Sequence, residues 1–158
     1  MVNAVKIGEI LAAAGYPVGA EAEEKFEIYL RYLTECNAKL NLTSIDSSEA
    51  PARHFADSLQ AAEFIPDGAT VLDIGSGAGF PGIVLSLLLP DRSFVLIERM
   101  QRRVGFLRGV IARTGIGNAE VSDRDIKEER RKFDAVTARA FHPLFDVAGD
   151  VLPLLQGD

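Results

Sequence analysis

From residue 70 onward, the chain alternates between short apolar runs and longer segments in which apolar residues recur at helical spacing. The short runs have the length of buried strands, and the longer segments have the periodicity of helices that bury one face. In chain order, the pattern predicts strand 70–74, helix 81–89, strand 93–97, helix 100–114, strand 119–121, strand 133–138 and helix 143–155. Helices of this length return the chain across a sheet, so the alternation predicts an α/β fold in which a mostly parallel sheet has helices on both faces.

The N-terminal part of the chain shows only the helical pattern. Three helices are expected there, over residues 5–14, 22–36 and 53–64. Phe26, Leu30 and Leu33 recur at helical spacing in the second helix. Phe55 and Leu59 share one face of the third. These faces are expected to point inward, because an amphipathic helix buries its apolar stripe against another element.

The composition is that of an ordinary globular protein with one core: 158 residues, of which 47% are hydrophobic and 25% charged. We expect residues 1–66 to form a helical segment packed on an α/β core of residues 67–158, within one structural domain. The single Cys36 and two histidines are too few soft ligands for a zinc site, so no metal is expected. No signal peptide and no apolar run of membrane-spanning length is present, which predicts a soluble, cytoplasmic protein with no membrane partner.

Charge is distributed in blocks along the chain. The net charge of -6 argues against a protein that coats nucleic acid by bulk electrostatics. Residues 99–139, however, contain 11 basic and 6 acidic residues. Such a basic block is either a solvated helix face with a charged loop or a local anion-binding surface, and its position relative to a site has to decide between them.

Four glycines, at positions 75, 77, 79 and 82, lie between the first predicted strand of the core and the helix that follows it. In open α/β sheets this crevice is where ligands bind. The glycines let the backbone approach the ligand, and the start of the helix offers unpaired N–H groups. Four glycines in so short a segment also impose a backbone entropy cost that a plain turn does not require. The loop therefore predicts a nucleotide site.

The loop is compatible with two kinds of nucleotide. Residues 77–82 match the G-x-G-x-x-G pattern of dinucleotide sites, and Glu98 follows about 20 residues later, where an acid binds ribose. Read from Asp73, the same string is D-x-G-x-G-x-G, which resembles motif I of the class I S-adenosylmethionine-dependent methyltransferases. In that case the loop, with Gly75 and Gly77, meets the methionine part of the cofactor. Glu98 then accepts charge-assisted hydrogen bonds from the ribose hydroxyls.

Asp125 and Ile126 follow the third predicted strand and lie on the same edge of the sheet as the loop. A carboxylate there accepts a hydrogen bond from the exocyclic amine of adenine, and the next backbone N–H donates to a ring nitrogen. Alone, Asp125 would be interpreted as a surface charge. Together with the glycine loop, it favours adenine binding.

Five separate strings of the sequence resemble a single family. They are N-A-K-L-N-L-T-S at 37–44, R-H-F-A-D-S at 53–58, D-I-G-S-G-A-G-F-P-G at 73–82, R-R-V-G-F-L at 102–107 and A-R-A-F at 138–141. The family is the bacterial small-subunit ribosomal RNA methyltransferase historically called glucose-inhibited division protein B. The resemblance runs from about residue 22 to residue 155. It implies a class I methyltransferase (Rossmann-like) fold with an N-terminal helical extension.

The resemblance implies S-adenosylmethionine-dependent methylation of N7 of a guanosine in 16S ribosomal RNA. It implies cofactor contact at Gly75, Phe80, Asp125, Ile126 and Arg139. Guanine N7 has a free lone pair and no proton to remove, so the reaction needs orientation of the reactants and no general base. No catalytic residue is therefore assigned.

The partner that the resemblance implies is small-subunit ribosomal RNA. Arg53, Arg139 and the basic block are expected to contact phosphates around a splayed-out base. His54 is expected to pack near the site, so Arg53 and His54 are the candidate substrate-binding residues. The alternative for Arg139 is an ion pair with an acid in the loop after the fourth strand.

Two other functions stay open. The G-x-G-x-x-G match fits an NAD(P)-dependent oxidoreductase. A non-catalytic RNA-binding domain is the second, because the family fold normally continues through three more strands and this chain stops at Asp158. The fold is thus expected to be truncated after the fourth strand, whose outer edge would be unpaired. The sequence predicts no oligomeric state.

Overall fold

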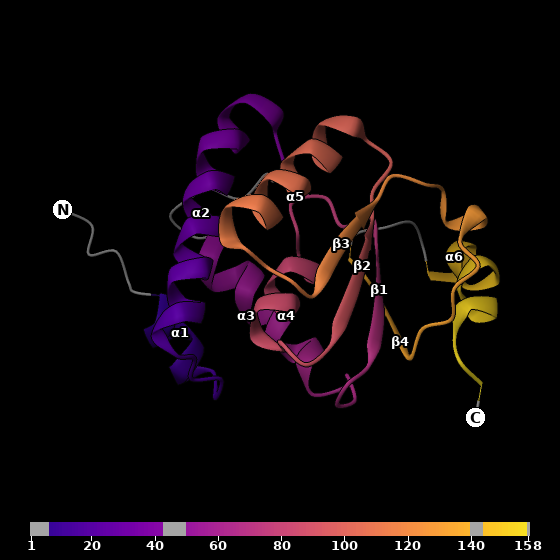
Figure 1. The fold of residues 1–158 in the computed structure, drawn as a ribbon, viewed down its shortest axis with the longest axis horizontal. Helices are drawn as coiled ribbons and strands as arrows, with labels where there is room; N and C mark the ends of the chain where they lie inside the picture. The colour runs from indigo at the N-terminus through magenta and orange to yellow at the C-terminus, as the bar shows by residue number, and fades with distance from the viewer. Residues whose placement is uncertain (1–6, 43–49, 140–143, 158) are drawn as a thin grey trace.

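The computed structural model describes residues 7–42, 50–139 and 144–157, and within these the side chains of 50–53 and 144–146 are left aside. In chain order the elements are α1 (Ile7–Ala13), α2 (Ala20–Leu40), α3 (Ala50–Ala62), β1 (Thr70–Ile74), α4 (Gly82–Leu88), β2 (Ser93–Ile97), α5 (Gln101–Thr114), β3 (Ala119–Ser122), η1 (Ile126–Glu128), β4 (Ala135–Ala138), α6 (Leu144–Val151) and η2 (Leu152–Leu154), where η marks a 3-10 helix. Figure 1 shows these elements from one side of the sheet.

The four strands form one parallel sheet in the order β3-β2-β1-β4. The chain moves outward from β1 through β2 to β3 and then returns to the other side of β1 to form β4. β1 is therefore the point at which the strand order reverses, and in open α/β sheets ligands bind at the carboxyl ends of the strands beside such a switch point. The predicted parallel sheet is confirmed.

Alternate residues of the central strands face opposite layers of the molecule. Val71 and Phe94 belong to a core shared with the N-terminal helices, α4 and α5. Leu72 and Val95 belong to a second core that includes Val147 of α6. Figure 1 shows α1 to α5 on one side of the sheet and α6 on the other, so helices cover both faces as predicted.

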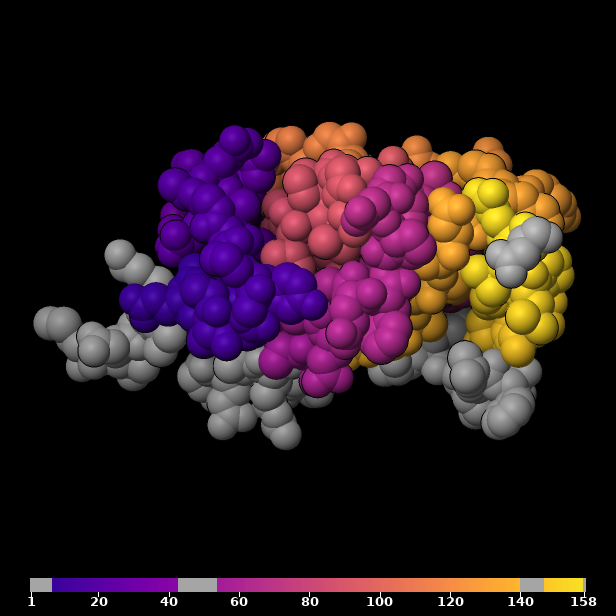
Figure 2. All heavy atoms as spheres, turned by 90° about the horizontal axis from the view of Figure 1, so that it is seen from below, coloured from indigo at the N-terminus to yellow at the C-terminus, as the bar shows by residue number. Residues whose placement is uncertain are grey.

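The N-terminal helices pack on the helices of the α/β core: α2 lies against α5 and α3 against α4. The Tyr32 ring stacks on Phe106 with 5.3 Å between ring centroids. A Cβ at Gly109 would lie 2.5 Å from the Tyr32 hydroxyl oxygen, so this close approach of α2 to α5 requires glycine at that position. In Figure 2 these N-terminal helices occupy one end of the molecule and the C-terminal segment the other.

Two details of α2 correct the prediction. The helix continues past residue 36 to Leu40 and ends at Asn41, whose left-handed conformation (φ 47°) closes the last turn. Tyr29 is fully buried, whereas Leu30 is only partly buried. Leu30, which the helical spacing placed on the inward face, packs against the edge of the core. Tyr29 is buried because its hydroxyl has a hydrogen-bond partner, which is described below.

The C-terminal part needs two further corrections. β4 begins at Ala135, and Phe133 instead forms an isolated parallel bridge with Leu155. The last helix ends at Val151 and tightens into η2 around Pro153, because proline lacks the N–H that an α-helix needs in its interior. The bounds of β1 and β2 agree with the prediction, and apart from the ends of α2 and α6, the other bounds that can be compared shift by at most three residues. Residues 5, 6 and 143 of the predicted helices lie outside the described residues.

Within the described residues, no strand pairs with the outer edge of β4. None of the described helices is long and apolar enough to span a membrane.

Candidate functional site

A pocket of about 610 Å³ opens at the carboxyl ends of the strands, beside β1. Its volume lies in the range of small-molecule sites. All seven residues predicted to contact a cofactor line it, as does one predicted substrate residue: Gly75, Gly77, Phe80, Glu98, Asp125, Ile126, Arg139 and His54. The second predicted substrate residue, Arg53, lies in α3, and its side chain is outside the described part. The strand order thus brings together residues from five separate segments of the chain.

The glycine loop forms one wall of this pocket. Gly75, Gly77 and Gly79 have φ values of 66°, 54° and 95°, which side chains with a Cβ rarely adopt. The N–H groups of Gly75 and Ser76 both donate to the carbonyl of Ile97, at 2.9 and 3.2 Å. The loop is therefore held against the end of β2 by two hydrogen bonds, and the glycines at 75 and 77 place backbone without side chains at the pocket.

Glu98 is buried at the end of β2, with 5% of its surface exposed. One carboxylate oxygen accepts from the N–H of Gly77 at 3.0 Å, and the other accepts from the N–H of Met100 at 2.9 Å. Arg103 approaches the same carboxylate at 4.0 Å. Glu98 therefore links the glycine loop to the start of α5. Each oxygen retains a second lone pair that can accept from a ligand.

Asp125 lies at the other side of the pocket and caps η1. Its Oδ1 accepts from the N–H of Lys127 at 3.0 Å, and its Oδ2 forms an ion pair with Arg99 at 3.0 Å. Ile126, the next residue, is buried in the core on the α6 side of the sheet. Glu98 and Asp125 thus face one pocket from the ends of neighbouring strands, as the sequence predicted.

Asp73 lies beneath the loop and does not line the pocket. Its side chain is fully buried, and Oδ1 accepts from the Thr137 hydroxyl at 2.8 Å, which joins β1 to β4. Among the described residues, Oδ2 has no hydrogen-bond partner. Burial raises the pKa of Asp73 to about 6, although the Thr137 hydrogen bond acts in the opposite direction.

Arg139 follows β4 and connects it to α3. Its guanidinium donates to Asp57 Oδ2 at 3.0 Å and meets His54 Nδ1 at 2.6 Å. Because arginine has no acceptor, the Nδ1 atom accepts this hydrogen bond. The His54 ring in turn stacks on Phe80 of the loop, with centroids 4.4 Å apart. The ion pair that the alternative interpretation of Arg139 expected is therefore present, with its acid on α3.

The sequence prediction missed several residues of this region. Leu42 and Met100 line the pocket. Tyr29 and Thr137 lie outside the lining and donate hydrogen bonds to Ala78 and Asp73. Leu42 belongs to one of the strings that carry the family resemblance, so that string was the available signal. Among the described residues, no group of three His, Cys, Asp or Glu side chains is arranged to hold a metal ion.

Residues 22–158 match the family model for rRNA small subunit methyltransferase G. The chain belongs to this family. It is 35% identical over 147 residues to the ribosomal RNA small subunit methyltransferase G of Lactobacillus helveticus, covering 86% of this chain and 61% of that protein. It is 39% identical over 148 residues to the methyltransferase G of Rhodopseudomonas palustris, covering 89% and 63% respectively. The chain thus spans about three fifths of the length of these curated relatives.

Solved structures confirm the fold of this member of the methyltransferase G family. Coclaurine N-methyltransferase bound to N-methylheliamine and SAH has a TM-score of 0.64 at 15% identity, covering 96% of this chain and 54% of that one. TYW2 of M. jannaschii in complex with AdoMet has a TM-score of 0.59 at 17% identity, covering 65% and 48%. The class I methyltransferase fold is therefore shown. The family assignment also disfavours the nicotinamide oxidoreductase alternative.

Proposed function

We propose that this chain binds S-adenosylmethionine in the pocket and transfers its methyl group to N7 of a guanosine in small-subunit ribosomal RNA. One observation carries the proposal. Glu98, Asp125 and the glycine loop share a single pocket beside β1, in a chain of the methyltransferase G family. The names of the relatives, ribosomal RNA small subunit methyltransferase G, support the class of substrate.

The donor set of the pocket suits a sulfonium nucleoside. Glu98 would accept hydrogen bonds from the ribose hydroxyls with its remaining lone pairs. Asp125 and the N–H of Ile126 would recognise adenine. Gly75 and Gly77 would let the backbone approach the methionine part, where a Cβ would otherwise project. These five residues are acidic or uncharged, as contacts to the hydroxyl, amine and methionine groups of the cofactor require, whereas the arginines of the lining, Arg99, Arg103 and Arg139, remain for other contacts.

The reaction requires positioning by this chain and no proton transfer. S-adenosylmethionine supplies an activated methyl group when it is bound. Guanine N7 attacks with its own lone pair, so the chain has to hold the nucleophile in line with the methyl carbon and the leaving sulfur, and such orientation lowers a barrier by several kcal/mol. Arg99 and Arg103, at the mouth of the pocket, would contact RNA phosphates. Arg53, His54 and Arg139 would contact the RNA on the α3 side.

Methyl transfer from labelled S-adenosylmethionine to an unmodified small-subunit RNA transcript tests the proposal, followed by mapping of the methylated base. Calorimetry of the cofactor alone is the companion measurement. We expect saturable binding and label at one guanosine N7. Glu98→Gln should weaken cofactor binding, whereas Glu27→Gln, at an exposed position of α2 outside the pocket lining, serves as the matched control. Absence of cofactor binding would refute the proposal, and binding without transfer would favour an RNA-binding module.

We further propose that residues 1–66 and 67–158 act as one structural domain, which the contacts of α2 with α5 and of α3 with α4 support. Ribosomal RNA as substrate also supports a cytoplasmic location. Size-exclusion chromatography after limited proteolysis tests the first statement, because separation of the two parts without denaturant would contradict it.

A further inference from the structure

We propose that Tyr29 of α2 is a positioning residue for the cofactor: its hydroxyl fixes the peptide after Ala78 and so sets the shape of the glycine loop. The inference rests on the proposed function and extends the cofactor machinery to the N-terminal helices. Tyr29 does not line the pocket, so it would act on the cofactor only through the loop.

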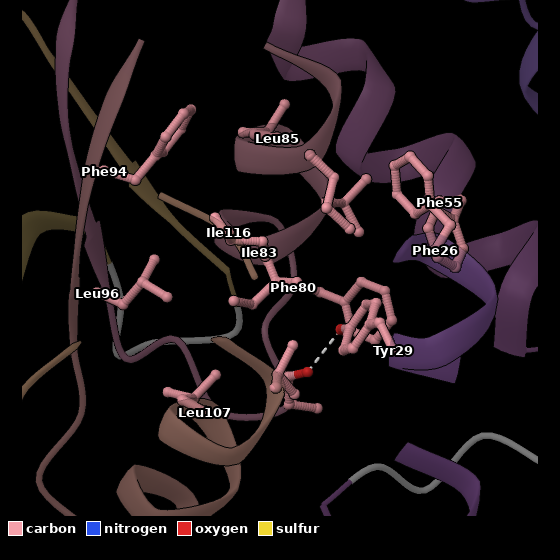
Figure 3. Close-up of a cluster of buried hydrophobic side chains, with 14 of the residues drawn as sticks. Phe26, Tyr29, Phe55, Phe80, Ile83, Leu85, Phe94, Leu96, Leu107 and Ile116 are labelled. Carbon is pink, nitrogen blue, oxygen red and sulfur yellow. Dashed lines mark hydrogen bonds between the residues drawn. The ribbon is translucent and has the colours of Figure 1, made fainter. Parts of the chain in front are cut away.

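The Tyr29 hydroxyl donates to the carbonyl oxygen of Ala78 at 2.6 Å. The dashed line in Figure 3 marks this hydrogen bond. Its ring is fully buried, lying 5.7 Å from Phe80 and 6.4 Å from Phe55 between centroids. The side chain is therefore held by aromatic neighbours on α3 and on the loop, and only its hydroxyl reaches the loop backbone.

This hydrogen bond complements the one made by Glu98. Glu98 holds the N–H of Gly77 from the β2 side, and Tyr29 holds the carbonyl of Ala78 from the α2 side. Gly77 and Gly79 flank Ala78 and have positive φ values. Within the loop, the N–H of Gly79 donates to the carbonyl of Ser76 at 2.7 Å. Glu98 and Tyr29 add two anchors from other elements, and that of Tyr29 is the one on the Ala78 carbonyl.

Gly79 lies directly beside the Tyr29 hydroxyl. A Cβ at Gly79 would lie 3.0 Å from the Tyr29 hydroxyl oxygen and 2.7 Å from Ile83 Cγ1. The hydroxyl therefore occupies space that the missing side chain leaves. Burial, and then the nearby charge of Asp73, raise the pKa of Tyr29 well above its usual range, so the hydroxyl keeps its proton and stays a donor.

Replacing Tyr29 by phenylalanine tests the inference, because it removes the hydroxyl and retains the ring. The Ala78 carbonyl, in a residue that is 8% exposed, would lose its partner. We expect the calorimetric Kd and the KM for S-adenosylmethionine to rise about fivefold to tenfold, while the KM for RNA stays within about twofold. Tyr32→Phe is the matched control, since Tyr32 lies on the same helix but stacks on Phe106. It should leave both constants unchanged.

A second measurement does not need the cofactor. Amide hydrogen exchange of Gly77 and Gly79 should become several-fold faster in Tyr29→Phe and not in Tyr32→Phe. A lower Tm with unchanged cofactor affinity and unchanged loop exchange would overturn the inference and leave Tyr29 a packing residue. If the wild-type chain binds no S-adenosylmethionine, the proposed function fails instead, and faster exchange in Tyr29→Phe would then still show that Tyr29 shapes the loop.

Discussion

The two ends of the sheet use polar groups in opposite ways. At the amino ends of the strands, polar side chains form hydrogen bonds with neighbouring segments of the chain. Asn118, before β3, donates through its side-chain amide to the carbonyls of Ser86, Leu89 and Arg92. The Asp134 carboxylate, before β4, accepts from both the N–H and the hydroxyl of Thr70. These groups hold neighbouring strands and turns together.

At the carboxyl ends, two carboxylates face the pocket and a third is incompletely paired. Glu98 and Asp125 turn carboxylates toward the pocket, and Asp73 keeps one buried oxygen without a partner among the described residues. A buried carboxylate without full pairing costs free energy. The amino-end groups thus satisfy their hydrogen bonds within the chain, whereas the carboxyl-end carboxylates keep acceptor capacity at the end where a ligand would bind.

The largest loss of stability should come from adding a side-chain atom at Gly82, near the carboxyl ends of the strands. In Gly82→Ala, the new Cβ would lie 2.4 Å from Asp73 Oδ2 and 2.4 Å from Leu96 Cδ2, and both of these side chains are fully buried. We expect the free energy of unfolding to fall by about 3 kcal/mol and cofactor affinity to fall with it. Urea denaturation and calorimetry measure the two quantities.

Gly105→Ala is the control, because nothing lies within 4 Å of a Cβ there and the residue is inside α5. It should raise the free energy of unfolding by up to about 1 kcal/mol, since alanine favours the helix. Equal destabilisation by the two alanine substitutions would contradict the argument from close contact.

The pH dependence should next distinguish two buried carboxylates, Asp73 beneath the glycine loop and Glu129 between η1 and β4. Because the pKa of Asp73 is about 6 in the folded protein, the folded state keeps a proton that the unfolded chain releases near pH 4. The free energy of unfolding should therefore fall as pH rises from about 4 to about 6, by about 3 kcal/mol in total. Asp73→Asn should remove this slope, as measured by urea denaturation across that range.

Glu129 should show the opposite sign. The hydrogen bond from Arg131 lowers the pKa of Glu129 to about 2. Its stabilising contribution is present at neutral pH and is lost as pH falls from about 4.5 to about 2. Glu129→Gln should remove that acid loss and leave the slope between pH 4 and 6 intact. Identical pH profiles for the two variants would refute the comparison.

A smaller loss of stability is expected from a substitution at the amino ends of the strands. Asn118→Ala removes all three hydrogen bonds of that side-chain amide, and the free energy of unfolding should fall by about 2 kcal/mol. The cofactor Kd should not change, because Asn118 lies at the amino ends of the strands and the pocket lies at the carboxyl ends. A Kd that worsens in step with the Tm would show that the two ends are not independent.

The smallest change in stability is expected from Arg139→Ala. The side chains of Arg139 and Asp57 are 30% and 58% exposed, so their ion pair should contribute less than about 1 kcal/mol. Cofactor or RNA binding should nevertheless weaken about tenfold, since Arg139 lines the pocket. Filter binding and thermal melts measure the two effects. Equal loss of Tm and binding would contradict a role in the site.

Local patterns were sufficient to predict the sheet and the side of it that carries the pocket. β1 and β2 are short apolar runs bounded by glycine, proline or charged residues, so their ends are marked in the sequence. Glu98, Asp125 and Arg139 follow strands, and the carboxyl ends of parallel strands meet at one edge. Strand order together with the glycine motif therefore indicated that these residues lie near one another. Their binding roles stay predictions.

Contacts between distant segments could not be predicted in this way. The hydrogen bond from Tyr29 to Ala78 and that from Thr137 to Asp73 join residues 49 and 64 positions apart. Nothing in the local periodicity distinguishes a tyrosine that meets a loop carbonyl from one at the surface. The partner of Arg139 was missed for the same reason, because Asp57 is on a helix whose orientation depends on the packing of Phe55.

The fit of Tyr32 over Gly109 has a consequence for how sequences of this kind diverge. The phenol ring occupies the volume that any larger residue at position 109 would need. A lineage that acquires a side chain at 109 must also shrink residue 32 or move α2 away from α5. Substitutions at these two positions should therefore be inherited as correlated pairs, whereas positions on the solvent side of α5 diversify independently.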